Sequence, residues 1–343
     1  NQVDFIIKNN GFLIAFGKVE NKMCDYVEIN PDEFTSWASR NITKLVKESL
    51  SQQVNLDYGQ QHWVVYLAGE GTFNNFGKML SSALVKAPIS VIYGQLQSLP
   101  VSRNKIPGFI ENFEINMDDF VPEDGGSLET PYSSFNSFFI RAFKKGARKI
   151  VADKSKMPAF SEARYFGYDS ISDEKTIPVK GQFLNSKELL GNAKWTETFN
   201  DGPLLLARLC PVDYHRFHFP DSGKVIDNYK VGGLYHSVNP IALKEKQDIF
   251  STNVREVTIL ETENFGKIAY VEVGAICVGR IVQSTDLTTF ERGQEKGYFL
   301  FGGSTVIIIG EKGKWSPSQD ILDYTDKGIE TYIQLGDEVA SKK

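Results

Sequence analysis

Short apolar runs separated by Gly, Pro, Asn and Asp fill the chain from about residue 132 onward. Runs of this length with turn residues between them are typical of β-strands. The first 120 residues differ: after a strand-like run at residues 12–16, apolar side chains recur every three or four positions in residues 31–50, 73–84 and 102–113. That spacing predicts amphipathic helices. The pattern therefore predicts an α+β fold, with a helical N-terminal part followed by a β-rich core.

A turn-rich, acidic stretch at residues 122–131 separates the two parts and reads as a linker. It divides an N-terminal strand and helix region (residues 1–121) from the β-rich region (residues 132–343). The N-terminal region contains a hydrophobic stripe over residues 73–99, which would ordinarily form a pair of core helices. The alternative is an interfacial segment that rests on a bilayer, with lysines at its edge.

Composition narrows the class of protein. The 343 residues are 41% hydrophobic and 24% charged, the balance of an ordinary soluble protein. A net charge of -5 leaves no broad basic field, so no nucleic-acid partner is expected. The three cysteines lie far apart without a CxxC pair, which indicates neither a disulfide framework nor a thiolate zinc site and fits a reducing compartment. No apolar run reaches the roughly 18 residues of a spanning helix.

Two strand-like runs, residues 298–301 and 306–309, flank a Gly-Gly-Ser-Thr turn. Glycine leaves its backbone carbonyl open to close approach, so the hydroxyl of Ser304 follows an unshielded carbonyl at Gly303. One interpretation is a bulged hairpin with a Ser-Thr edge. The other is a site at which the chain cuts itself.

Two of the four histidines, His215 and His218, occur in the segment DYHRFH. On a strand they would point to opposite faces, and on a helix they would share one. No third ligand with suitable spacing is evident, so no metal site is predicted. The remaining alternatives are two structural histidines or a general base, a role suited to the pKa of imidazole.

Several motifs resemble the phosphatidylserine decarboxylase family, in family order, along residues 102–339. They are DYHRFH (213–218), SVNP (237–240), VGAICVGRI (273–281), GQEKGYFLFGGSTV (293–306) and the closing segment 328–336. The Gly-Gly-Ser-Thr form and the long spacing before DYHRFH look most like the longer bacterial and fungal branch. The resemblance makes residues 132–343 the expected catalytic core.

The resemblance implies a pyruvoyl cofactor made from the chain's own serine. Ser304 would attack the carbonyl of Gly303, giving chains 1–303 and 304–343. His218 matches the family base for this cut, and His215 is the expected helper in decarboxylation. The carboxylate that orients the base should be an Asp in a Pro-Ala-Asp-Gly-like segment about 14 residues beyond Ala-Arg. Counting without gaps reaches Glu162 instead, a departure that adds one methylene.

The expected function is therefore conversion of phosphatidylserine to phosphatidylethanolamine and CO2. Alternatives are a soluble pyruvoyl-dependent decarboxylase of free aromatic amino acids and a lipid-binding homologue that does not process itself. A lipid substrate favours residues 73–99 as a docking surface on an anionic membrane. The expected location is peripheral, at the cytoplasmic face of a membrane, and the expected partners are the protein's own two chains and a second copy in a homodimer.

Overall fold

The computed structural model describes residues 12–15, 64–67, 96–122, 131–171, 186–234, 248–275, 281–284, 288–301 and 304–343. The central feature of these ranges is an eight-stranded sheet in which every neighbouring pair is antiparallel. Its strands, in spatial order, are β11 (Thr289–Phe290), β7 (Gly223–Val231), β8 (Arg255–Thr262), β9 (Lys267–Gly274), β13 (Ser304–Gly310), β5 (Leu204–Leu209), β4 (Ala163–Tyr168) and β15 (Thr331–Ile333).

Strand β13 lies in the interior of this sheet, between β9 and β5, and both of its faces are covered. All seven of its residues are buried, as are all six of β5 beside it. A strand buried on both faces carries a nearly continuous apolar run, and Val306 to Ile309 supply it. Their β-branched side chains also suit the extended backbone.

Three smaller sheets complete the described strands. One contains β10 (Ile281–Gln283), β12 (Glu295–Phe299) and β6 (Arg216–His218); another contains β14 (Trp315–Pro317), β16 (Glu338–Lys342) and β3 (Lys156–Pro158); β1 (Phe12–Ala15) pairs with β2 (Val64–Leu67). The β10-β12-β6 sheet packs on the face of the large sheet that carries Ser304. The contact includes a buried ion pair between Lys296 of β12 and Glu272 of β9, with Nζ and Oε1 2.6 Å apart.

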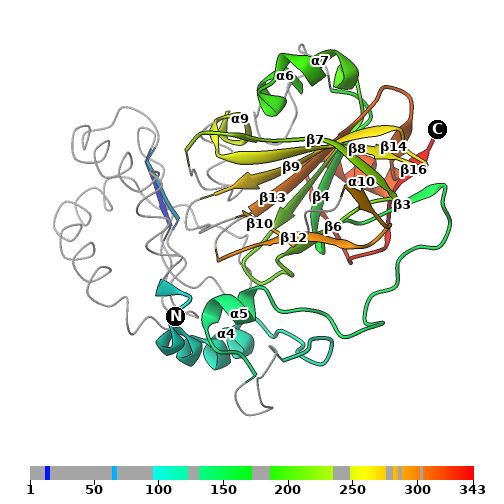
Figure 1. Cartoon of the computed structure of the whole chain (residues 1–343). Coiled ribbons are helices and arrows are strands. Elements are labelled where there is room, and N and C mark those ends of the chain that lie inside the picture. Colours follow the sequence, from blue (N-terminus) through cyan, green and yellow to red (C-terminus); the bar gives the residue numbers. More distant parts are fainter. Residues whose placement is uncertain are drawn as a thin grey trace.

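Two short helices, α6 (Ser186–Leu190) and α7 (Ala193–Phe199), cover the other face of the large sheet (Figure 1). Arg255 of β8 reaches them by donating from Nε to the carbonyl of Leu189 at 2.6 Å. Two further helices are α9 (Ile249–Thr252) and α10 (Gln319–Thr325). The described β-rich region is thus a layered structure in which the large sheet, with β13 inside it, lies between a second sheet and helices.

An aromatic cluster joins the end of the N-terminal region to the start of the β-rich region. The 3₁₀ helix η2 (Pro100–Lys105) leads into α4 (Ile106–Asn112), and both lie beside α5 (Phe135–Phe139), below the sheets in Figure 1. Phe109 of α4 packs edge-on against Phe135 with ring centroids 5.2 Å apart. Phe301 packs edge-on against Phe135 at 5.3 Å and so belongs to the same cluster.

The α+β class predicted from the sequence is confirmed, and so are the strand at 12–16 and a helical segment at 102–113. Most of the stripe predicted at 73–99 (residues 73–95) and most of the linker predicted at 122–131 (residues 123–130) lie outside the described residues. The division into regions therefore stays a prediction. Within the described ranges, no helix combines the length and the apolar character needed to cross a membrane.

The hairpin interpretation of residues 298–309 is wrong. β12 pairs with β10 and β6, whereas β13 pairs with β5 and β9 in the large sheet. The two runs are close in sequence, and local strand propensity cannot distinguish a hairpin from a crossing between sheets. The chain therefore passes from one sheet to another immediately before Ser304.

Candidate active site

Ser304 is the first residue of β13 and is fully buried. It pairs with Leu209 of β5 on one side and with Gly274 of β9 on the other. Opposite residues of an antiparallel pair place their side chains on the same face. Gly274 has no side chain, so on that flank no side chain lies directly opposite the Ser304 hydroxyl.

His215 lies against this hydroxyl, with Nδ1 3.3 Å from Ser304 Oγ. Its other nitrogen, Nε2, is 2.9 Å from the carbonyl oxygen of Cys210. Since a carbonyl only accepts, Nε2 carries the proton, and Nδ1 is left to accept from the serine. The ring of Phe139 stacks on the imidazole with centroids 3.6 Å apart.

The imidazole of His215 is held in its neutral form. Complete burial lowers its pKa, with a further contribution from the positive charge of Arg141, to about 3. Desolvation disfavours the charged form of a buried histidine. His215 is thus neutral at physiological pH, with the lone pair of Nδ1 directed at the hydroxyl of Ser304.

Three side chains hold the loop that carries His215. Arg141 donates from Nη2 to the carbonyl of Val212 at 2.7 Å. The buried carboxylate of Asp213 accepts from the backbone N–H of Cys210 at 2.7 Å and from Arg164 Nη1 at 2.5 Å. Since Cys210 in turn binds His215, this network fixes the orientation of the imidazole.

His218 has different surroundings. It is on β6, three residues beyond His215, so it is about 10 Å farther along an extended chain and faces the opposite way. Its Nδ1 donates to the carbonyl of Gly293 at 2.9 Å, and its Nε2 accepts from the hydroxyl of Tyr214 at 3.2 Å. Burial lowers the pKa of His218. Of the two alternatives considered for this segment, strand and helix, the structure has the strand, which includes His218.

Glu162 takes part in a different network. Arg148 donates to both of its oxygens, at 2.5 and 2.8 Å, and also reaches Asp119 at 2.9 Å. The hydroxyl of Tyr332 and the backbone N–H of Leu335 complete the set at 3.1 and 3.2 Å. These contacts connect the segment before β4 to β15, through Tyr332, and to the segment after β15, through Leu335.

The structure therefore brings His215 to Ser304 but does not bring the other two predicted residues there. Among the hydrogen bonds of the described residues, none joins His218 to Ser304 or to Glu162. Glu162 was chosen by counting 14 residues beyond Arg148, and its role as the orienting carboxylate stays a prediction. The partner of Glu162 is Arg148, the residue from which the 14 positions were counted. Gly303, on the other side of the scissile bond, lies outside the described residues.

Sequence reasoning also left residues of the FNSFFIR segment without roles. Phe139 covers His215, Arg141 holds its loop, and Asn136 accepts a hydrogen bond from the backbone N–H of Phe301 at 2.8 Å. The segment is rich in aromatic and polar residues, but these three contacts are with distant parts of the chain, which a local pattern does not indicate.

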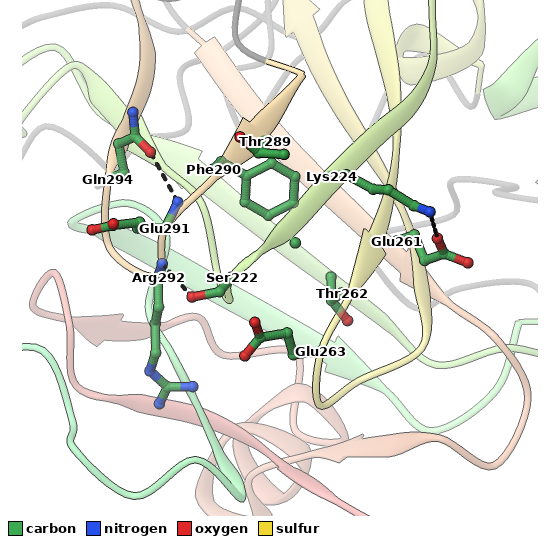
Figure 2. Close-up of a pocket in the computed structure, with 11 residues that line it drawn as sticks. Ser222, Lys224, Glu261, Thr262, Glu263, Thr289, Phe290, Glu291, Arg292 and Gln294 are labelled. Carbon is green, nitrogen blue, oxygen red and sulfur yellow. Dashed lines mark hydrogen bonds and ion pairs between the residues drawn. The ribbon is translucent and has the colours of Figure 1, made fainter.

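An open cavity of about 1020 Å³ lies elsewhere, where β7, β8 and β11 meet (Figure 2). Lys224 and Glu261 form an ion pair on one side of it at 2.6 Å, and Ser222 accepts from the backbone N–H of Arg292 on the other. Glu261 of β8 pairs with Lys267 of β9. Lys267 precedes Ile268, which pairs with Gly310 at the end of β13 far from Ser304. The cavity is therefore at the opposite end of the sheet from Ser304.

Comparison with known proteins identifies the family. A sequence model described as phosphatidylserine decarboxylase matches residues 135–340. The phosphatidylserine decarboxylase proenzyme of Clostridium tetani is 43% identical over 254 residues, covering 74% of this chain and 84% of that protein. The proenzyme of Fusobacterium nucleatum is 39% identical over 284 residues, covering 80% and 92%. The chain has a buried serine at the start of its central strand and a neutral histidine in contact with that serine. It belongs to the phosphatidylserine decarboxylase family.

Proposed function

We propose that the chain is a proenzyme that cuts itself between Gly303 and Ser304 and then converts phosphatidylserine to phosphatidylethanolamine and CO2. Membership of the family supports the reaction and its substrate. The observation that carries the proposal for this chain is the contact between Ser304 Oγ and the lone pair of His215 Nδ1 at 3.3 Å.

Self-cleavage requires a base at the serine, because a hydroxyl is a weak nucleophile at its ordinary pKa. His215 Nδ1 takes the proton as Oγ bonds to the carbonyl carbon of Gly303. The peptide C–N bond then breaks, and the nitrogen of residue 304 receives the proton. Loss of the Cα proton and cleavage of the Cβ–O bond release Gly303 as a carboxylate. Water replaces the nitrogen of residue 304, which leaves as ammonia, and the product is a pyruvoyl group.

The surroundings of Ser304 fit this group. It is smaller than serine, because Oγ leaves with Gly303, the former Cβ becomes a methyl group and a keto oxygen takes the place of the backbone nitrogen. It therefore fits in the space of Ser304, beside Gly274 and His215, on which Phe139 stacks. When formed, the pyruvoyl group supplies a carbonyl that joins the substrate amine and takes up the electron pair as CO2 leaves. The ring of Phe139 limits the access of water. His215 lies beside this group and would relay a proton to the substrate carbon after its Nδ1 has received one.

The two products of the cut are expected to stay together as one enzyme. Residues 304–343 would begin with β13, which forms ladders with β5 and β9 of residues 1–303. They also contribute β15 and β16, which pair with β4 and β3. Breaking one peptide bond leaves all of these backbone hydrogen bonds in place.

A peripheral location at an anionic membrane, on its cytoplasmic face, is part of the proposal. Leu99, the last residue of the predicted docking segment, and Val101 just after it are 47% and 45% exposed. Arg103 is exposed near them and suits an anionic headgroup. Lys105 does not, because it is buried and donates to Gln97 Oε1 at 3.2 Å. The homodimer stays a prediction.

The first prediction concerns the substrate. Purified protein mixed with phosphatidylserine-containing vesicles is expected to produce phosphatidylethanolamine, measured by lipid mass spectrometry, while the Ser304→Ala variant stays uncut and inactive. CO2 release from a free aromatic amino acid, with no turnover of the vesicles, would establish the soluble alternative instead. Vesicle binding by an uncut wild-type chain would establish the non-processing homologue.

The second prediction separates the two histidines. Because His215 is the imidazole that contacts Ser304, His215→Ala should slow self-cleavage by about 10²-fold or more. His218→Ala should leave cleavage within about threefold of the wild-type rate. The rates are measured by gel densitometry of freshly synthesised chain. The reverse result, with His218→Ala blocked and His215→Ala normal, would restore the assignment made from the resemblance.

The third prediction concerns Glu162. Loss of its negative charge in Glu162→Gln should weaken the bidentate contact with Arg148 and lower the melting temperature, because charged hydrogen bonds are stronger than neutral ones. Self-cleavage of the folded variant should continue at nearly the wild-type rate. A large loss of cleavage without loss of stability would instead show that Glu162 acts on the catalytic histidine.

The fourth prediction is the pH dependence of self-cleavage. A lowered pKa keeps an imidazole neutral to lower pH, and the pKa of His215 is about 3. The rate should therefore be nearly constant from about pH 5 to pH 8. A base with the ordinary imidazole pKa of about 6.5 would lose most of its activity at the lower end of this range. A rate that falls by half near pH 6.5 would contradict the prediction.

A further inference from the structure

The backbone immediately before Ser304 needs support from outside the sheets. β12 ends at Phe299 and β13 begins at Ser304, so Phe301 falls between them and its N–H has no strand partner. Phe301 is buried, with 7% of its surface exposed. A buried N–H without a partner is unfavourable, and Asn136 provides that partner: its Oδ1 accepts from Phe301 N at 2.8 Å.

Asn136 is a junction between three segments. Its backbone N–H donates to the carbonyl of Gln97 at 2.9 Å, and its Nδ2 donates to Ser98 Oγ at 2.8 Å. It is itself 4% exposed. Since a backbone N–H only donates, the contact with Phe301 fixes which end of the side-chain amide faces each neighbour.

The helix that carries Asn136 also holds the base. Phe139 of α5 stacks on His215 at 3.6 Å and packs edge-on against Phe301 at 4.9 Å. The helix has a rigid start, because Ser134 and Ser137 form a capping box. One short helix therefore contacts both the imidazole and the backbone two residues before the scissile carbonyl.

We propose that Asn136 is a positioning residue for self-cleavage: it fixes the backbone at Phe301 so that the Gly303 carbonyl is presented to Ser304. This inference rests on the proposed function. It assigns to Asn136 no contact with reacting atoms. Its effect comes from orientation, and small displacements of reacting groups are known to reduce rates strongly.

The test compares variants that separate the two side-chain contacts. Asn136→Leu removes both of them. Asn136→Asp keeps an oxygen for Phe301 N and offers a second oxygen to the Ser98 hydroxyl. Ser98→Ala is the matched control, because it removes the partner of Nδ2 and leaves the bond to Phe301. Self-cleavage rates and melting temperatures are measured for all of them.

Asn136→Leu should cleave at least about tenfold more slowly than wild type, whereas Asn136→Asp and Ser98→Ala should stay within about threefold of it. If Asn136→Leu does not fold, Asn136→Ser takes its place, since a serine hydroxyl is too short to reach Phe301 N. Wild-type cleavage in the folded Leu or Ser variant would overturn the inference. The inference would also be overturned if Ser98→Ala slowed self-cleavage as much as Asn136→Leu or Asn136→Ser does.

Hydroxylamine provides a readout that a loss of stability alone would not give. It cleaves the ester formed when Ser304 attacks Gly303 but leaves the peptide bond intact. With impaired attack, Asn136→Leu should release less of the 304–343 fragment into hydroxylamine than wild type does. Release at the wild-type rate would place the defect after the attack and overturn the inference. A wild-type chain that never cleaves would instead refute the proposed function itself.

Discussion

The proposed self-cleavage depends on one contact, between the hydroxyl of Ser304 and the lone pair of His215 Nδ1. It requires a neutral imidazole with its proton on the other nitrogen. The carbonyl of Cys210 selects that tautomer, and burial under Phe139 keeps the ring uncharged. Charged groups nearby are arranged around the loop that carries His215, where Asp213 and Arg164 neutralise each other. The electrostatics of the site thus serve to keep the base neutral and in place.

The position of the serine explains how a chain can be cut without losing its fold. Ser304 begins a strand that is paired on both sides and buried on both faces. The preceding residues leave one sheet to reach another and are supported from α5. The proposed cleavage point is therefore at the start of a strand with partners on both sides. β13 lies on the C-terminal side of that bond, and both of its partner strands, β5 and β9, lie on the N-terminal side.

Local sequence patterns were sufficient for several features. The alternation of short apolar runs and turn residues predicted the β-rich core. Periodicity also predicted that His215 and His218 would face opposite ways on a strand. These features depend on neighbours in sequence, which is why the sequence could predict them.

Features that depend on distant pairings could not be predicted in this way. Which histidine faces Ser304 is decided by the register of β6 and β13 in two different sheets. The hairpin interpretation failed for the same reason, since β12 and β13 have no common partner. The carboxylate of Glu162 has a charge suited to orienting a histidine, but it accepts hydrogen bonds from Arg148 and Tyr332 instead. A carboxylate identified by counting residues does not reveal which of several possible partners it contacts.

Intact-mass spectrometry of freshly purified protein tests the central claim most directly. Self-cleavage at Ser304 predicts two chains, residues 1–303 and residues 304–343, with the smaller one lighter than its serine form by one ammonia. A single chain of full mass, stable at neutral pH, would contradict the claim that Ser304 and His215 are arranged for the cut.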